Sequence, residues 1–349
     1  MIRSTFKNDD CIYLLKDLTG VIKETSLDEK EKLIAQGVNY SEMISKEYPI
    51  SDEINEIFKV TLNQNAKKLA YYVGVIAEEI YRRGKEETII VSLARAGSPV
   101  GALVKRYIKK KYSVDVPHYS ISIIRDKGID ENALNYIREH HPNGVMTFVD
   151  GWTGKGSITK ELHKAIKLYN DKNGTNISDD LAVLADPARL SAIAGTKDDV
   201  CIPNACLNST VSGLVSRTIH NKDLIGENDF HGAKIFDYLE NQDMTNYFLD
   251  IVEENFTFED KEMKCLIDRN CVSQIIEKLA QEFPMVDINK VKLSIGESSR
   301  ALLRRKPYIL LVKNKSNPDL SFVLHLAKEK NVEVREYDTM GYECISLLQ

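Results

Sequence analysis

Short apolar runs alternate, between residues 88 and 185, with longer segments whose apolar positions recur at helical spacing. The runs are rich in β-branched and aliphatic residues, as expected of strands buried on both faces of a sheet. Four strands are predicted: Thr88–Leu93, His118–Ile124, Val145–Val149 and Leu181–Ala185. Helices are predicted after the turn Ala94–Ser98 through Lys111, at Asp130–His140 and at Lys155–Tyr169. The alternation predicts an α/β fold with a doubly wound parallel sheet, whose ligands bind beyond the carboxyl ends of the strands.

The first 85 residues predict a helical, polar N-terminal cap on this sheet. An apolar stripe at helical spacing runs through Gln64–Arg83, and Ser51 is a candidate N-cap for a short helix over Ser51–Val60. The first forty residues show no regular pattern and are expected to be irregular.

The chain after residue 190 divides into a covering region and a second domain. Residues 190–240 are loop-rich and expected to lie over the crevice at the strand ends, and Phe256–Lys264 is a charged boundary. A small α/β domain is predicted beyond it from helices and strands at Cys271–Phe283, Tyr308–Val312, Ser321–Lys330, Glu333–Tyr337 and Cys344–Leu348. The predicted domains are therefore 1–260 and 261–349.

Composition narrows the class without deciding the function. The 349 residues are 43% hydrophobic and 28% charged, with a net charge of −5, which fits a globular protein. No segment approaches the roughly 20 apolar residues of a membrane span, and the N-terminus is polar, so we expect a cytoplasmic protein without a membrane partner. None of the six cysteines forms a Cys-x-x-Cys pair, which argues against structural zinc. A homo-oligomer remains open.

The segment Phe148–Thr159 is the strongest chemical signal. A buried strand ends in Asp150, and a loop rich in Gly, Thr and Ser leads into a helix, whose N-terminus attracts anions. It is not a Walker loop, because Val149 stands in place of the first glycine and Gly156 follows Lys155. The plainer alternative is a strand–loop–helix turn capped by a hydroxyl group.

This segment resembles the PRPP-binding motif of type I phosphoribosyltransferases, except that Gly151 stands where the family usually has a second acid. Ser92–Pro99 resembles the family's pyrophosphate loop, and Arg125–Gly128 falls where it has a mobile catalytic loop. The resemblance implies that Asp150 holds the ribose hydroxyls and, indirectly, Mg²⁺. It implies catalytic roles for Arg125 and Lys127, substrate contacts for Asp186 and Arg217, and phosphate binding by Arg95, Ala96, Gly97, Thr153, Gly154, Lys155, Gly156 and Ser157.

Nearly the whole chain also resembles bacterial proteins encoded near tellurium-resistance and stress-response genes. The resemblance rests on SLARAGSPVG, FVDGWTGKGSIT and CIPNACLNSTVSGLVSRTI. In that family a phosphoribosyltransferase-like domain is fused to a Pelota-like RNA-binding domain, and the family also carries the label of cysteine protease (StiP). A protease needs a thiolate activated by a neighbouring base, for which Cys206 with His220 or His231 is the candidate set.

A basic cluster marks the C-terminal domain. Arg300 and Arg304 are four residues apart, on one predicted helical face, and Arg305 follows. Such a face is typical of phosphate-backbone binding and predicts an RNA contact, although a merely solvated face is equally consistent with it.

The main prediction from these signals is a phosphoribosyltransferase that uses PRPP, with Mg²⁺, to form or cleave an N-glycosidic bond. Two alternatives remain: a nucleotide-sensing, RNA-binding regulator without catalysis, and a cysteine protease using Cys206.

Overall fold

The fold is given by a computed structural model. It describes residues 1–7, 9–26, 29, 32–33, 36–261, 272–287 and 290–348.

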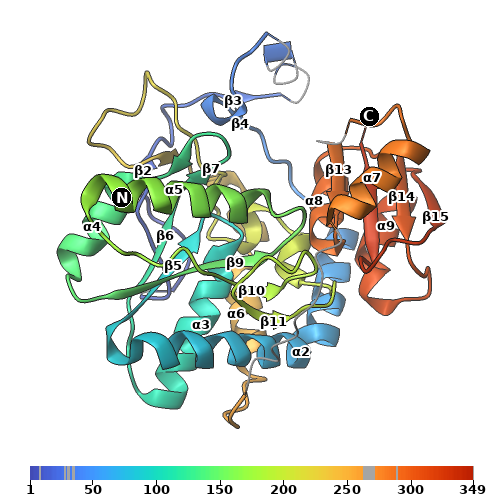
Figure 1. The fold of residues 1–349 in the computed structure, drawn as a ribbon. Helices are drawn as coiled ribbons and strands as arrows, with labels where there is room; N and C mark the ends of the chain where they lie inside the picture. The colour runs from blue at the N-terminus through green and yellow to red at the C-terminus, as the bar shows by residue number, and fades with distance from the viewer. Residues whose placement is uncertain are drawn as a thin grey trace.

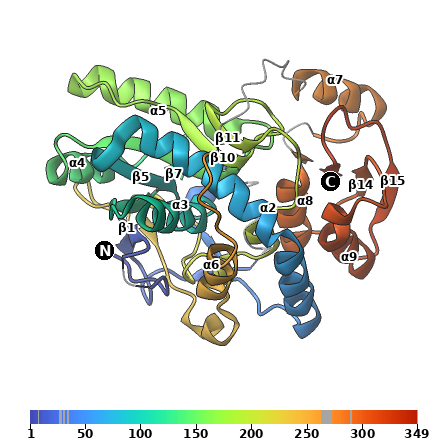
Figure 2. The same ribbon diagram turned by 90° about the horizontal axis from the view of Figure 1, so that it is seen from below.

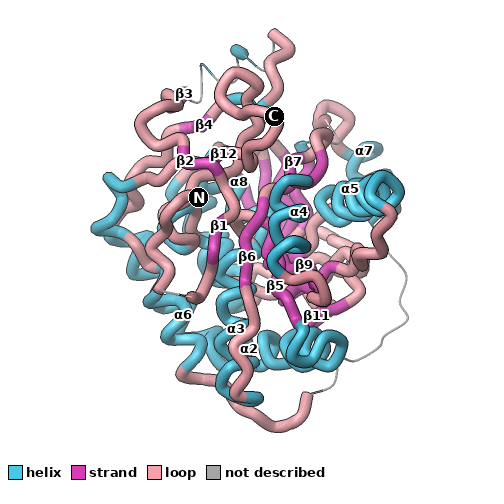
Figure 3. The backbone as a smooth tube through the Cα atoms, turned by 90° about the vertical axis from the view of Figure 1, so that its left-hand side faces the viewer, coloured by secondary structure: helices cyan, strands magenta, loops and turns pink. Residues whose placement is uncertain are grey.

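A parallel sheet of six strands forms the centre, in the order β1-β6-β5-β9-β10-β11. The strands are β1 (Ile12–Tyr13), β5 (Thr88–Leu93), β6 (His118–Ile121), β9 (Val145–Trp152), β10 (Leu181–Ala185) and β11 (Ile193–Thr196). Figure 3 shows β1, β6, β5 and β9 side by side. The α/β class and the parallel sheet are confirmed, while the type I phosphoribosyltransferase fold is not.

Helices cover both faces of this sheet. They are α2 (Asp52–Gly84), α3 (Gly97–Tyr112), α4 (Glu131–His140), α5 (Ser157–Asn173) and α6 (Thr245–Glu253). Figure 1 shows α2 and α3 on one face and α4 and α5 on the other. Each face has its own apolar core, with side chains such as Val104 in the first and Phe148 in the second.

The described residues before α2 are mostly irregular, as expected for the first forty. They contain the two-residue strands β1, β2 (Lys16–Asp17), β3 (Glu24–Thr25) and β4 (Ile44–Ser45). Strand β1 extends the main sheet, and β2 pairs with β12 (Gly232–Ala233). Strands of two residues are defined by their hydrogen bonds to strands elsewhere in the chain. They are too short to give a periodic pattern in the sequence.

The predicted second half of the cap is one continuous helix. α2 runs for 33 residues, and the Ser51 side chain accepts a hydrogen bond from Ile54 N, so the predicted N-cap is confirmed. The two predicted helical segments are therefore joined.

The predicted strand His118–Ile124 is divided in the structure. Its end forms β7 (Ile123–Ile124), which pairs with β8 (Gly128–Ile129) in an antiparallel hairpin outside the main sheet. The hairpin carries Arg125 and Lys127 in its turn.

The C-terminal domain has a four-stranded sheet of order β13-β16-β14-β15. Its elements are α7 (Val272–Glu282), β13 (Val291–Leu293), α8 (Ile295–Arg304), β14 (Ile309–Val312), α9 (Ser321–Glu329), β15 (Glu333–Glu336) and β16 (Cys344–Leu347). Figure 2 shows this domain beside the end of α2, with α8 and α9 toward the N-terminal domain. The predicted boundary after residue 260 stays a prediction, because residues 262–271 lie outside the described part.

None of the helices in the described ranges combines the length and the apolar character that crossing a membrane requires.

Candidate functional site

The sheet order creates a crevice between β5 and β9. From β5 the chain passes through α3 to β6 on one side, and from β9 it passes through α5 to β10 on the other. The loops after β5 and β9 therefore diverge at neighbouring strand ends, where ligands bind in open α/β sheets.

The first half of the predicted phosphate loop is tied to its own domain. Thr153 N donates to Ala185 O, and the Thr153 hydroxyl donates to the Asp186 carboxylate at 2.6 Å. Asp186 is fully buried and also pairs with Lys197 at 2.6 Å. These contacts place Asp186 inside the fold, so the structure corrects its predicted contact with a substrate.

The same loop is covered by the C-terminal domain. The Tyr342 hydroxyl donates to Gly154 O at 3.0 Å, and the Glu297 side chain packs against Gly154. At Gly296, a Cβ atom would lie 2.5 Å from Cε2 of the Trp152 indole, so the indole ring packs directly against the Gly296 backbone. An open phosphate site at Thr153 and Gly154 is thereby contradicted.

The rest of the loop gives no open anion site either. Leu190 packs against Gly156, and Ser157 opens α5 beside it. Burial lowers the pKa of Lys155 to about 8, and the nearby Lys292 and Arg125 add to the effect. Lys155 thus lies among other cations at the domain contact.

The predicted pyrophosphate loop is held by internal bonds. Arg95 donates to Val215 O at 2.9 Å and pairs with Glu47 at 2.5 Å. Burial acts to raise the pKa of Glu47, but the charge and hydrogen bonds of Arg95 outweigh it and hold that pKa below its usual value. Ala96 O accepts from the Asn204 amide, and at Gly97 a Cβ would strike Val149 O. Gly97 therefore allows α3 to begin close against β9.

The predicted catalytic loop lies apart from this crevice. Arg125 and Lys127 are exposed in the β7–β8 turn, and Arg125 lies 3.6 Å from Asp126. Neither residue lines the main cavity.

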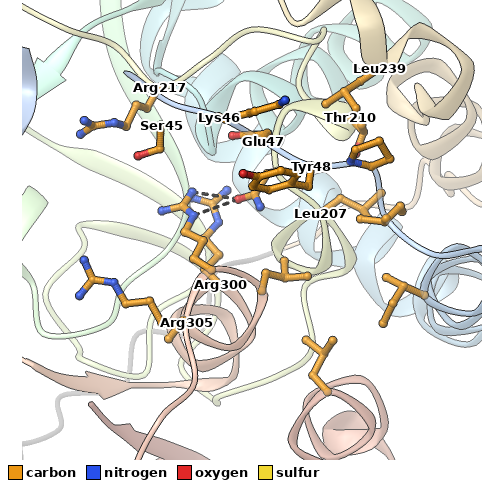
Figure 4. A pocket seen from close by; sticks show the side chains of 18 of the residues that line it. Ser45, Lys46, Glu47, Tyr48, Leu207, Thr210, Arg217, Leu239, Arg300 and Arg305 are labelled. Carbon is orange, nitrogen blue, oxygen red and sulfur yellow. Dashed lines mark hydrogen bonds between the residues drawn. The ribbon is translucent and has the colours of Figure 1, made fainter. Parts of the chain in front are cut away.

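The main cavity opens between the two domains and has a volume of ≈ 790 Å³. Five of the predicted residues line it: Arg95, Arg217, Arg300, Arg304 and Arg305. The structure adds Lys46, Glu47, Asn208, Lys292 and Lys330, which no motif in the sequence indicated. Figure 4 shows Arg217 and Arg305 on one side of the cavity and Leu207 and Leu239 on the other.

The arginines predicted to bind RNA line this cavity, where Arg304 and Arg305 are exposed and Arg300 is partly buried. Arg304 donates to Asn208 Oδ1 at 2.9 Å, and Arg300 lies 4.7 Å from the centre of the Trp152 ring. Burial lowers the pKa of Arg300 to about 9, with further contributions from Arg304 and Arg95. Arg300 Nε is buried and has no hydrogen-bond partner among the described residues.

Asp150 lies near the carboxyl end of β9, on one side of the crevice. Burial raises its pKa to about 7, although the Gly151 N–H and the charge of Arg300 act in the opposite direction. A carboxyl group with this pKa exchanges a proton near neutral pH, as a general acid or base must. The Mg²⁺ predicted beside it remains untested, and among the described residues no three His, Cys, Asp or Glu side chains cluster to hold a metal.

Cys206 lies in the 3-10 turn Pro203–Cys206, which crosses the crevice. Asn204 in this turn donates to Ala96 O after β5 and lies over Gly151 of β9, and its Oδ1 is buried without a hydrogen-bond partner among the residues that the structure describes. Cys206 itself is buried, and burial together with Cys201 raises its thiol pKa.

The predicted histidine partners of Cys206 lie elsewhere. His231 bonds to the Ser122 hydroxyl at 2.9 Å, and the His220 ring lies tilted against the His231 ring with ring centres 4.7 Å apart. Within the described ranges, no recorded hydrogen bond joins a histidine to a thiol. Cys265 and Cys271 lie outside those ranges.

Residues 4–253 match the family model described as tellurite-like stress resistance cysteine protease StiP. Residues 271–349 match the model of the PELOTA RNA binding domain. A curated relative, the cysteine protease StiP of Acinetobacter baylyi (strain ATCC 33305 / BD413 / ADP1), is 33% identical over 365 aligned residues, covering 99% of this chain and 94% of the relative. These findings contradict the phosphoribosyltransferase prediction and favour the cysteine protease alternative, and they leave PRPP without support as a partner.

Proposed function

Because the chain belongs to the family of tellurite-like stress resistance cysteine proteases, we propose that it is a thiol-dependent peptidase with Cys206 as its nucleophile. The observation that supports Cys206 is the path of its turn. Asn204, two residues earlier, reaches from the end of β5 to the end of β9, which places the turn across the β5–β9 crevice. Of the other cysteines in the described ranges, Cys201 and Cys344 are buried like Cys206 and Cys11 precedes the edge strand β1, so the path of the turn, and not burial, distinguishes Cys206.

The reaction requires a base, because the thiolate and not the thiol attacks a peptide carbonyl. Asp150 is the group in the crevice with a suitable pKa, and we assign it this role. It accepts the proton as Cys206 Sγ bonds to the carbonyl carbon. The proton then passes to the leaving amine as the C–N bond breaks, and water cleaves the thioester to return the acid and the thiol.

The described conformation is a closed state under this proposal. Cys206 shares an apolar cluster with Ile295 and Leu302 of α8, and burial keeps its thiol protonated. Attack on a substrate therefore requires α8 to move off the turn. Displacement of the C-terminal domain would be the step that exposes the nucleophile.

The test is cleavage of an unfolded, fluorescently labelled protein by the full chain. Cys206→Ala should lower the rate by roughly 10³-fold or more, since no other group replaces the nucleophile. Cys201→Ala is the matched control, because Cys201 is buried in the same cluster, and it should retain the rate within a few-fold. Iodoacetamide labelling read by mass spectrometry then identifies the reactive thiol among all six cysteines. If inactivation instead follows labelling of Cys265 or Cys271, the assignment of Cys206 as the nucleophile is wrong. If the parent protein shows no thiol-sensitive cleavage, the proposed peptidase function is wrong.

A second function is supported by the C-terminal match. We propose that residues 271–349 bind RNA, as the description of their family model states. Since Arg300 and Arg304 face the cavity, the phosphate contacts would come from exposed lysines such as Lys306 and Lys315. Fluorescence anisotropy of the full chain with structured RNA should show affinity falling as salt rises. Lys306→Ala with Lys315→Ala should reduce the slope by about 0.7 to 0.9 per lost contact, and an unchanged slope would exclude these lysines.

A further inference from the structure

The cavity between the domains is basic on a protein that is acidic overall. Eight of its lining residues are Lys or Arg and three are Glu, whereas the whole chain has a net charge of −5. Cations are thus concentrated in one hollow. Because a concave surface of one charge sign focuses the electrostatic field, it raises the local concentration of oppositely charged ligands.

Internal partners compensate only part of this charge. Glu47 neutralises Arg95 and also accepts from Ser209, so its carboxylate is occupied. Arg304 and Arg95 share the neutral Asn208 amide oxygen. Arg300 has the Trp152 ring on one side and a buried Nε that finds no hydrogen-bond partner in the described part of the chain. A buried guanidinium N–H without an acceptor is costly, and an incoming carboxylate would satisfy it.

The opposite side of the cavity is aliphatic. Its lining includes Pro49, Ile50, Leu207, Leu239 and Leu326. Single-stranded RNA sites usually present several aromatic rings for base stacking. Here the aromatic lining residues are Tyr48, which is exposed, and Phe236, which is buried. Aliphatic pockets beside arginines fit a peptide whose acidic and apolar side chains alternate.

We propose that this cavity binds acidic peptide segments, whose carboxylates pair with Arg300, Arg304 and Arg305 while neighbouring apolar side chains contact the aliphatic wall. The proposal names the substrate class of the proposed peptidase and rests on that function. Leu207 lines the cavity and directly follows Cys206, so a peptide held here lies beside the turn that carries the thiol. The volume, ≈ 790 Å³, suits a segment of a few residues.

Binding is measured in the full-length Cys206→Ala protein, so that cleavage does not enter the measurement. The probes are fluorescein-labelled peptides of equal length, one alternating Glu with Leu, one alternating Gln with Leu and one alternating Lys with Leu. The acidic peptide should bind at least about 10-fold more tightly than the neutral one, and the preference should shrink at high salt. Equal affinity for the acidic and neutral peptides would overturn the proposal.

Variants then locate the contact. Arg300→Gln should weaken the acidic peptide by roughly 10- to 100-fold, because it removes a charged donor from a desolvated site. Arg305 and Lys46 are exposed at the cavity, so Arg305→Gln and Lys46→Gln should each weaken the affinity for the acidic peptide by about 3-fold. Lys306→Gln is the matched control, since Lys306 is adjacent but does not line the cavity. The rim variants keep the test valid if Arg300→Gln fails to fold.

Three outcomes separate the explanations. Acidic-peptide binding that falls with the cavity variants but not with Lys306→Gln supports the proposal, even where the parent protein cleaves nothing and the peptidase fails. Cleavage by the parent without any acidic preference overturns the proposal and leaves the peptidase standing. Loss of structured-RNA affinity in the cavity variants, with unchanged peptide affinity, assigns the cavity to RNA and overturns the proposal.

Discussion

Asp150 lies two residues before the end of strand β9, in a place where its negative charge is costly. Its pKa of about 7 lies above the value of about 3.9 expected in the unfolded chain. The folded protein therefore keeps the proton over a pH range in which the unfolded chain has released it. Stability should consequently fall as pH rises from about 4 to about 7, by the contribution of this group.

Asp150→Asn should remove that contribution. The stability of the variant relative to the parent should increase as pH rises from 5 to 8, because the amide has no charge to bury. Denaturant unfolding at four pH values measures the difference. The proposed peptidase activity should fall in the same variant, since an amide accepts no proton at neutral pH. If the stabilities of variant and parent depend on pH in the same way, burial does not raise the pKa of Asp150.

Sequence reasoning found the arginines of the cavity but not its lysines, and it did not place the arginines together. Arg95, Arg217 and Arg300 were predicted as ligand contacts from separate motifs, and the structure brings all three to one cavity. Glu47 was not predicted. It lies 48 residues before Arg95 in an irregular segment, and only the tertiary fold gives it a partner.

Helix α8 belongs to the C-terminal domain and packs against the N-terminal domain. The Ser294 side chain caps it, and Ile295 N donates to the Asp199 carboxylate at 3.0 Å. The same carboxylate accepts from Glu343 N at 2.9 Å, so one side chain of the N-terminal domain binds two backbone donors of the other. Burial raises the pKa of Asp199 to about 7.

Asp199→Ala should loosen α8 from the N-terminal domain. Two N–H groups lose their acceptor, at a cost of about 1–3 kcal/mol for each group that stays buried and unpaired. Hydrogen exchange at Ile295 and Glu343 should accelerate by roughly 10-fold or more. The control, Asp198→Ala, changes an exposed neighbour bonded only to Thr196 and should leave both rates unchanged. Equal rates in the two variants would mean that other contacts hold the helix.

Helices and strands with a clear apolar pattern in the sequence were predicted. Short strands that are defined only by pairing with another segment were missed. β5 and β10 were found with their observed bounds, because each is a compact apolar run. β1, β11 and β13 have two to four residues and show no such run. The basic face of α8 was also predicted, but its position at the cavity between the domains depends on complementary surfaces that no local pattern encodes.

At the scale of the whole molecule, Gly296 and Trp152 form a tight contact between the two domains. Trp152 is the only tryptophan in the chain, which makes its fluorescence a direct report of this contact. Its indole lies between Gly296 and the Arg300 guanidinium, and 9% of the residue is exposed.

Gly296→Leu should separate the domains, because a side chain at this position overlaps the indole ring. The tryptophan emission should shift to longer wavelength as water reaches Trp152, and small-angle scattering should give a larger radius of gyration. If domain opening exposes Cys206, alkylation of that thiol should also accelerate. The control, Gly226→Leu, meets only the Asp229 carboxylate and should change none of the three readings. Unchanged emission in Gly296→Leu would show that the contact adapts without opening.

The pairing of the first strands has a consequence for synthesis on the ribosome. Strand β1 (Ile12–Tyr13) cannot pair until Tyr119 and Ser120 have been synthesised. Strand β2 (Lys16–Asp17) cannot pair until Gly232 and Ala233 have been synthesised. At about 5–20 residues per second, the second partner emerges roughly 10 to 45 s after β2 itself. Helix α2, by contrast, has its own cap and i→i+4 bonds as soon as it leaves the exit tunnel. The segment that contains β1 and β2 is translated before its partners and is therefore fixed late, and during that interval its strand edges are open to pairing with other nascent chains.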